Sequence, residues 1–313
     1  MIDLASKKIL ITGANGFLGS HIVENMLEKR GAQKENLFLP SSRELDLRKW
    51  DNCVKAVKNQ DIVIHTAARV GGIGFSSSKP GEIFYDNIMM GVQLMEAARL
   101  ACVKKFTAIG TVCEYPKYTP IPFKEENLWD GYPEPSHAAY GLSKKMYLVQ
   151  GKSYEQQYGF NSIHPLLVNL YGPRDNFDLE TSHVIPATIR KILEAQRKNE
   201  KKITIWGTGS ATREFLYVAD AAEAIILATE KYASVEPVNI GSGQEISIKK
   251  LVATLCELME FKRKIQWDKT KPDGQPKRCL DTSKARQEFG FIAQTSRTQG
   301  LRQTINWYKK HAI

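Results

Sequence analysis

The chain carries side chains suited to proton transfer at three places along its length. Thr111 and Cys113 are two residues apart, Tyr140 and Lys144 are four apart, and His183 stands alone in the string SHVIP at 182–186. A phenol beside an ammonium can protonate a carbonyl oxygen, while a thiol and an imidazole can move protons at the neighbouring carbons. Together these residue types predict an active site for a substrate that carries a carbonyl group.

The spacing of Tyr140 and Lys144 puts both side chains on one face if they lie on a helix. The ammonium can then stabilise the phenolate, lower the pKa of the phenol and hold a nicotinamide ribose. Such pairs also occur on solvated helices without any function. Thr111 supplies a context, because it follows an apolar strand and its hydroxyl could emerge at the carboxyl edge of a sheet, where ligands usually bind.

Composition is that of a globular protein. The chain has 313 residues, of which 42% are hydrophobic and 25% charged, so we expect one large two-lobed domain or two domains around a buried core. Its five cysteines are scattered and form no CxxC pair, which predicts neither disulfides nor a metal site and favours a reducing cytoplasm. No apolar run approaches about 18 residues, and no signal sequence is evident, so we expect a cytoplasmic protein without a membrane partner.

Positive charge is spread along the chain, with a formal net charge of +10. Lys and Arg residues are distributed through amphipathic segments and accompany no RNA- or DNA-binding motif. We therefore expect no nucleic-acid partner. The charge instead suits an anionic small substrate.

Apolar strands alternate with helical patterns in the first half of the sequence. This rhythm predicts an α/β fold, a Rossmann-type doubly wound parallel sheet, followed by a smaller and mostly C-terminal substrate-binding lobe. We place an NAD(P)-binding domain at residues 1–168, with returning segments near 214–241, and the substrate-binding lobe at 169–313. The expected strands lie at 8–12, 37–39, 61–65 and 105–110, and the expected helices between them at 19–29, 48–58 and 80–101.

The first expected strand ends in GANGFLG at 13–19, a glycine turn that opens a helix. Glycines let the backbone approach a pyrophosphate, which the helix N-terminus attracts. The second strand ends without an Asp or Glu for a ribose diol, whereas Ser42 and Arg43 suit a 2′-phosphate. NADP(H) is therefore favoured, with NAD(H) left open.

The glycine turn, Thr111, Tyr140 and Lys144 together resemble the extended short-chain dehydrogenase/reductase family. Longer strings match its GDP-L-fucose synthase group, whose members epimerise C3 and C5 of GDP-4-keto-6-deoxy-D-mannose and reduce C4. The resemblance covers about residues 7–281 and implies conversion of that substrate, or a close analogue, to GDP-L-fucose or its analogue. The strings that carry it are HTAARVGGI at 65–73, CEYPK at 113–117, NLYGPRDNF at 169–177 and SHVIP at 182–186.

The resemblance implies catalytic roles for matching residues. Thr111 stands where the family has its catalytic Ser or Thr, Tyr140 where it has the proton donor, and Lys144 where it has the Lys that binds ribose. Cys113 and His183 match the pair that exchanges protons at C3 and C5. On the residues alone, Cys113 could equally be a buried apolar side chain and His183 a structural imidazole.

Binding residues and an oligomeric state are implied as well. Family members are commonly homodimers, paired through helices that match residues 80–101 and 140–158, so a homodimer is implied here. The residues implied to hold the nucleotide-sugar substrate are Asn169, Lys191, Trp206, Arg213 and Arg278. Those implied to hold the cofactor are Gly13, Asn15, Gly16, Phe17, Leu18, Gly19, Ser42, Arg43, Ala67, Tyr140 and Lys144.

Three other functions compete with this one. A sugar-nucleotide 4,6-dehydratase would follow its catalytic Thr with Asp-Glu, but Val112 and Cys113 stand here, which argues against dehydration. A 4-reductase or 4-epimerase without 3,5-epimerisation would have no use for Cys113 and His183, and it is the main alternative. A noncatalytic nucleotide-sensing protein on the same fold would be expected to lack one of the catalytic side chains.

Overall fold

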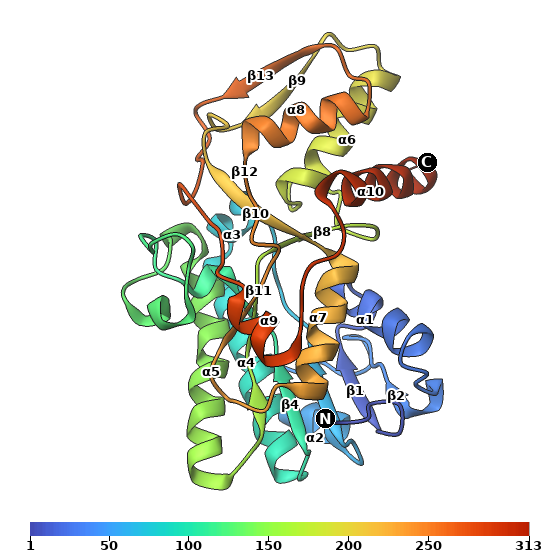
Figure 1. Cartoon of the computed structure of the whole chain (residues 1–313), viewed down its shortest axis with the longest axis vertical. Coiled ribbons are helices and arrows are strands. Elements are labelled where there is room, and N and C mark those ends of the chain that lie inside the picture. Colours follow the sequence, from blue (N-terminus) through green and yellow to red (C-terminus); the bar gives the residue numbers. More distant parts are fainter. Residues whose placement is uncertain (313) are drawn as a thin grey trace.

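The computed structural model describes residues 1–312, except for the side chain of residue 73, and its centre is a parallel sheet (Figure 1). The strand order is β2-β1-β3-β4-β6, and each neighbouring pair is parallel. β1, β3 and β4 are buried along their whole length, as expected of strands covered on both faces. The strands are β1 (Ile9–Thr12), β2 (Leu37–Phe38), β3 (Ile62–His65), β4 (Lys105–Ala108) and β6 (Ser162–Ile163).

Two of these strands continue after a one-residue break. β4 is followed by β5 (Gly110–Thr111) and β6 by β7 (Pro165–Leu167), and these two also pair in parallel. β7 in turn pairs in parallel with β11 (Val238–Ile240), which comes from much later in the chain. The sheet therefore extends to a strand contributed by the second half of the sequence.

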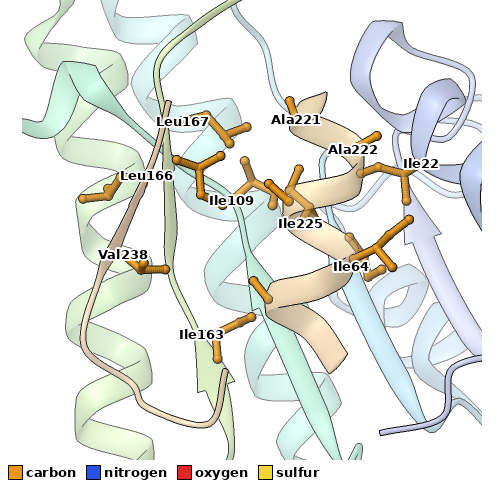
Figure 2. Packing of buried hydrophobic residues seen from close by; sticks show 14 of the residues in the cluster. Ile22, Ile64, Ile109, Ile163, Leu166, Leu167, Ala221, Ala222, Ile225 and Val238 are labelled. Carbon is orange, nitrogen blue, oxygen red and sulfur yellow. The ribbon is translucent and has the colours of Figure 1, made fainter. Parts of the chain in front are cut away.

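Helices cover both faces of the sheet. On one face, α1 (Phe17–Glu28) packs against α7 (Val218–Lys231), and on the other, α4 (Pro80–Leu100) packs against α2 (Trp50–Val57) and α5 (Ala138–Tyr158). Small side chains such as Ala221 and Ala222 let α7 approach the sheet, where Ile225 meets the isoleucines of the strands (Figure 2). The predicted doubly wound Rossmann-type fold is confirmed.

A second hydrophobic core lies beyond the carboxyl ends of the strands (Figure 1). β8 pairs in parallel and β12 antiparallel with β10, while β9 and β13 form a separate parallel pair. The elements of this region are β8 (Asn169–Tyr171), α6 (Val184–Arg197), β9 (Lys202–Trp206), β10 (Thr212–Tyr217), β12 (Glu245–Ser247), α8 (Ile248–Leu258), β13 (Lys264–Asp268) and α10 (Arg297–His311).

Short helices complete the chain. α9 (Ser283–Phe289) packs on α7 and β11, so a C-terminal segment returns to the first core. The division into two domains at residue 168 stays a prediction.

No described helix combines the length and apolarity needed to cross a membrane. The other short helices are α3 (Ile73–Ser78), η1 (Lys34–Asn36), η2 (Val112–Glu114), η3 (Glu125–Trp129) and η4 (Pro135–His137).

Candidate active site

A cavity of about 930 Å³ opens at the carboxyl ends of β1 and β3, where the strand order reverses direction. This is the usual ligand crevice of open α/β sheets. Its walls come from the glycine turn, η2, α5, and the elements α6, β9 and β10 of the second core. The structure brings all five predicted catalytic residues to this cavity: Thr111, Cys113, Tyr140, Lys144 and His183.

The glycine turn after β1 is too tight for a side chain at position 13 or 19. Gly13 has a φ of +70°, and a Cβ there would lie 2.8 Å from the backbone nitrogen of Ala67. A Cβ on Gly19 would lie 2.2 Å from the carbonyl oxygen of Gly13. Helix α1 begins at Phe17 with no side-chain cap and no acidic residue in its first turn. Its free N–H groups and the positive end of its dipole lie at the cavity, and they therefore fit a dinucleotide pyrophosphate.

Of the two cofactor residues predicted at the end of β2, only one lies at the cavity. Ser42 lines the cavity, whereas Arg43 is exposed and is not among the lining residues. Arg48 and Arg69 line the cavity instead, and neither was predicted. The predicted cofactor residues that line it are Gly13, Asn15, Gly16, Phe17, Leu18, Gly19, Ser42, Ala67, Tyr140 and Lys144.

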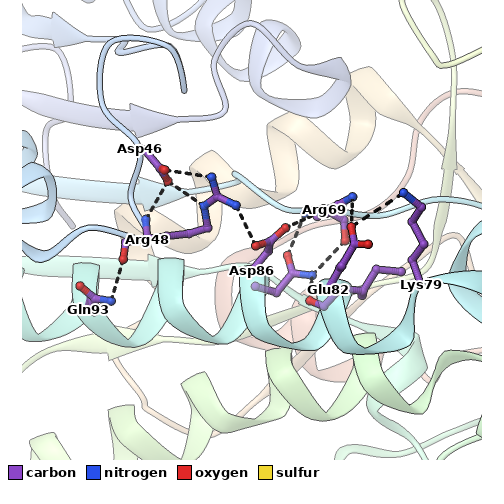
Figure 3. A network of polar contacts seen from close by, with 9 residues as sticks. Asp46, Arg48, Arg69, Lys79, Glu82, Asp86 and Gln93 are labelled. Carbon is purple, nitrogen blue, oxygen red and sulfur yellow. Dashed lines mark hydrogen bonds and ion pairs between the residues drawn. The ribbon is translucent and has the colours of Figure 1, made fainter.

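Both unpredicted arginines are engaged with carboxylates (Figure 3). Asp86 is 7% exposed and bridges them, with its oxygens 3.0 Å from Arg48 Nη1 and 2.6 Å from Arg69 Nη1. Asp46 and Glu82 bind the far sides of the two guanidinium groups at 2.9 and 2.5 Å. The arginines thus neutralise acidic groups and stiffen this wall, because each fork is already paired.

Thr111 ends β5 and caps the short turn η2. Its Oγ1 accepts a hydrogen bond from the backbone nitrogen of Cys113 at 3.3 Å, which leaves the hydroxyl proton free to point elsewhere. Helix α5 passes close over this turn, because a Cβ on Gly141 would lie 2.2 Å from the carbonyl oxygen of Cys113. The missing side chain at 141 therefore places Tyr140 against the turn that carries the hydroxyl and the thiol.

Tyr140 and Lys144 lie on α5, as predicted, with Lys144 only 1% exposed. Burial lowers the pKa of Lys144 to about 8, an effect that Glu114 partly opposes. Burial also raises the pKa of Tyr140, and Cys113 and Glu114 add to it. The expected lowering of the phenol pKa is thus wrong, because desolvation disfavours the phenolate and the groups that act on it are negative when ionised. A phenol that keeps its proton suits a proton donor.

Arg278 lies at the catalytic end of the cavity. Its Nη1 is 3.6 Å from Sγ of Cys113, and its Nε donates to Gln275 Oε1 at 3.0 Å. His183 immediately precedes α6 and is exposed to the cavity space. Desolvation inside the cavity lowers the pKa of His183, and the positive charge of Arg278 lowers it further. An imidazole held neutral in this way can accept a proton from a substrate carbon.

The remaining predicted substrate residues also line the cavity: Asn169, Lys191, Trp206 and Arg213. Trp206 is 43% exposed, which leaves ring surface for stacking. Arg213 Nη2 donates to the carbonyl oxygen of Asp273 at 2.9 Å, and burial followed by Arg278 lowers the pKa of Arg213 to about 10. Lys191 is half-buried, and together with Arg213 and Arg278 it gives this part of the cavity three cationic side chains. This part of the site is therefore built for an anionic ligand.

His137 is a cavity residue that the sequence analysis missed. It ends η4, three positions before Tyr140, and that helical spacing was the one signal in the sequence that pointed to it. Burial lowers the pKa of His137 to about 3, and Arg278, His183 and Arg213 add to the effect. The imidazole is therefore uncharged and can offer one nitrogen as a donor and the other as an acceptor.

Known proteins resemble this chain in sequence over most of its length. Residues 9–241 match the NAD dependent epimerase/dehydratase family. The chain belongs to this family. It is also 37% identical to GDP-L-fucose synthase 1 of Arabidopsis thaliana over 309 residues, which is 98% of this chain and 94% of that relative. The predicted family resemblance is thereby confirmed.

Solved structures resemble the whole chain. A GDP-6-OMe-4-keto-L-xylo-heptose reductase from C. jejuni has a TM-score of 0.91, with 28% sequence identity and 99% of each chain covered. A GDP-L-fucose synthetase from Naegleria fowleri bound to NADP has a TM-score of 0.86, with 27% identity, and the match covers 98% of this chain and 95% of that one. Both likenesses extend over almost the whole chain.

Proposed function

We propose that the protein is an NADP(H)-dependent sugar-nucleotide 3,5-epimerase and 4-reductase, which converts GDP-4-keto-6-deoxy-D-mannose to GDP-L-fucose or acts on a close analogue. One observation carries this proposal: a phenol, an ammonium, a thiol and an imidazole line a single cavity. The same cavity is also lined by the glycine turn and by the N-terminus of α1, which has no side-chain cap. The names of the Arabidopsis and Naegleria relatives support the same reaction and the same cofactor.

The cavity residues account for each proton in the reaction. A C4 ketone acidifies the protons on C3 and C5, which Cys113 and His183 exchange from the cavity walls. Tyr140 then protonates the C4 oxygen, and the free hydroxyl proton of Thr111 donates a hydrogen bond to it. NADPH, when bound, supplies the hydride that C4 receives. Lys144 would hold the nicotinamide ribose of the bound cofactor.

Three basic side chains of the cavity suit binding of the nucleotide diphosphate. Arg213, Lys191 and Arg278 carry positive charge, and their attraction for phosphate oxygens is strengthened by the partial exclusion of water. Trp206 offers an exposed ring for the base. Ser42 and the first turn of α1 lie at the cofactor end, where the hydroxyl suits a 2′-phosphate.

The proposal is tested by incubating the protein with GDP-4-keto-6-deoxy-D-mannose and NADPH in deuterated water. We expect loss of NADPH absorbance and deuterium at both C3 and C5 of the product. Cys113→Ser should suppress deuterium exchange far more than NADPH binding. Exchange at the wild-type rate in that variant would return Cys113 to a structural role.

A reductase without epimerisation is the second candidate, favoured by the near-complete overlap with the C. jejuni heptose reductase. It would oxidise NADPH with the same class of keto sugar but leave C3 and C5 unlabelled. Absence of any NADPH oxidation with this substrate would direct the search to other keto sugars, other nucleotides and NADH.

A homodimer in the cytoplasm completes the proposal. α4 and α5 pack side by side and leave Phe84, Tyr85 and Val149 at least 39% exposed. Two copies of this helix pair would bury those side chains as a four-helix contact. Elution at the monomer mass across a range of concentrations would contradict it.

A further inference from the structure

A buried pair of titratable side chains lies behind the catalytic turn and has no place in the reaction just described. Glu114 is completely buried and His164 is 2% exposed. His164 Nε2 lies 2.9 Å from Glu114 Oε2. Glu114 does not line the cavity, and neither does His164. Burying two such groups costs free energy unless their contacts repay it, so the pair calls for a physical explanation.

The pair is tied directly to the backbone of the catalytic turn. Glu114 Oε1 accepts a hydrogen bond from the backbone nitrogen of Thr111 at 2.8 Å. That bond closes a capping box with the Thr111 hydroxyl, whose oxygen accepts from the backbone nitrogen of Cys113. One carboxylate therefore fixes the backbone from which both the hydroxyl and the thiol project.

The neighbouring backbone is shaped to admit the pair. A Cβ on Gly110 would lie 2.5 Å from His164 Nε2 and 2.7 Å from Glu114 Oε1. Only the absence of a side chain at 110 lets the imidazole and the carboxylate sit against β5. The contact is consequently built into the strand that ends at Thr111.

The charge on the pair follows from its hydrogen bonds. His164 Nδ1 is buried with no partner among the described residues. A neutral imidazole that donates through Nε2 leaves only an unpaired acceptor there, whereas an imidazolium would leave an unpaired charged donor, which costs more. The arrangement thus favours a carboxylate held by a neutral imidazole, with one net negative charge.

Helix α5, which packs on this turn, carries two buried ammonium groups. Lys144 is 1% and Lys145 is 2% exposed. Lys145 Nζ donates to the carbonyl oxygens of Leu128 and Glu114, the latter at 3.4 Å. For both lysines, burial lowers the pKa and Glu114 raises it. A negative charge at Glu114 therefore keeps Lys144 protonated to a higher pH than its burial alone would allow.

Other groups around Lys144 do not supply this charge. Its Nζ lies 4.8 Å from the ring centre of Tyr147, whose pKa burial raises. His65 on β3 is fully buried, and burial and Lys144 hold its pKa well below the usual value. Burial also raises the pKa of Tyr140. These three groups are uncharged at neutral pH, so Glu114 supplies the negative charge that acts on Lys144 among the described residues.

We propose that Glu114 and His164 form a buried positioning pair for the proposed reaction: the pair fixes the turn that carries Thr111 and Cys113, and it places a negative charge in the turn that packs against α5, the helix of Lys144. The pair acts through other residues and does not touch the substrate. Its two functions are separable, because the backbone contact depends on an acceptor oxygen and the electrostatic effect depends on charge.

Three substitutions separate these functions. Glu114→Gln keeps an acceptor for Thr111 and removes the charge, Glu114→Asp keeps the charge and shortens the reach, and His164→Gln keeps the carboxylate without its imidazole clamp. Glu126→Gln removes the same charge from an exposed position and serves as the control. NADPH oxidation is measured from pH 6 to pH 10 with whichever keto sugar the wild-type protein reduces, and melting temperature is followed in parallel.

Loss of the Glu114 charge should move the basic limb of the activity–pH profile to lower pH. Without Glu114 the pKa of Lys144 falls further below its usual value, so activity in Glu114→Gln should decline at a pH lower by about half to one unit. Glu114→Asp should keep the wild-type limb but lose about tenfold in kcat, because the turn is no longer held. His164→Gln should show a smaller loss of kcat, and Glu126→Gln should match the wild type.

A binding titration tests the pair without turnover. Since Lys144 holds the ribose, the pH at which NADPH affinity falls should shift in the same direction in Glu114→Gln, read from nicotinamide fluorescence. The inference rests on the proposed function only for the kinetic assay: wild-type protein that reduces no keto sugar would sink that function, and the titration would still test the pair. An unshifted limb and an unshifted titration in folded Glu114→Gln would overturn the inference. If that variant does not fold, a wild-type kcat in both Glu114→Asp and His164→Gln would overturn it instead.

Discussion

The two ends of the cavity are built from different material. At the proposed cofactor end the surface is backbone: Gly13 lies in the turn after β1, Gly19 lies in the first turn of α1 against it, and the free N–H groups of α1 begin at the same place. At the sugar end the surface consists of side chains from distant parts of the sequence, among them Cys113, His183 and Arg278. A local turn is fixed by its own residues, whereas converging side chains depend on every element that carries them.

This difference predicts opposite sensitivities. The backbone end should tolerate a change of neighbouring charge and fail when a methyl group is added, because its glycines already touch other main-chain atoms. The side-chain end should tolerate small changes in volume and fail when a polar atom or a charge is removed, because its groups act through protons and electrostatics.

The largest effect is expected at the side-chain end from Tyr140→Phe. The substitution removes only the phenol oxygen, so the protein should fold and bind NADPH, while NADPH oxidation should fall by about 10²- to 10⁴-fold. Steady-state kinetics with the keto sugar measure the loss. Deuterium exchange at C3 and C5 should continue, because Cys113 and His183 are untouched. A variant that reduced the ketone at the wild-type rate would remove Tyr140 from the mechanism.

The next largest effect is expected at the backbone end from Gly19→Ala. The added methyl would lie 2.2 Å from the carbonyl oxygen of Gly13, so the turn must open, at a cost of about 1–3 kcal/mol in stability and a matching loss of NADPH affinity. Gly81→Ala is the matched control, because a Cβ at Gly81 meets no atom within 4 Å. Equal melting temperatures and equal NADPH affinities for the two variants would contradict a backbone-built site.

A smaller effect with a defined pH dependence is expected from Arg278→Met. Loss of the guanidinium removes a group that lowers the pKa of both His183 and His137. The pKa of His183 should therefore rise. As the pH is lowered, the imidazole of the variant becomes protonated at a higher pH than in the wild type. The acid limb of deuterium exchange should move to higher pH, with about a tenfold lower rate at neutral pH. An acid limb that stayed in place would show that Arg278 does not act on His183.

The smallest effect is expected from Arg43→Ala. Arg43 is exposed and does not line the cavity, so the KM for NADPH should change by less than about twofold. Ser42→Ala should raise it more, because Ser42 does line the cavity. A large loss of NADPH affinity in Arg43→Ala would restore the prediction made from the sequence and show that this side chain folds over the bound cofactor.

The sequence predicted most of the fold, and it predicted residues that the structure brings to one cavity, because many of the signals are local. The glycine turn, the buried strands and the four-residue spacing of Tyr140 and Lys144 each lie within a few residues of one another. Period and spacing express those short-range constraints directly. The strand β11 also gave a local signal, because its short apolar run near residue 240 predicted a segment that returns to the sheet.

Contacts between distant segments could not be predicted in this way. Nothing near Glu114 in the sequence indicates that its partner is His164, and nothing near Cys113 indicates that Arg278 will lie against its thiol. The pKa of Tyr140 was predicted in the wrong direction for the same reason, because burial is set by the whole fold. The sequence by itself determined which chemical groups the protein has and the local turns that present them. Only the tertiary structure decided which groups meet and which are shielded from water, because charge and proton affinity depend on distance and solvent access rather than on order along the chain.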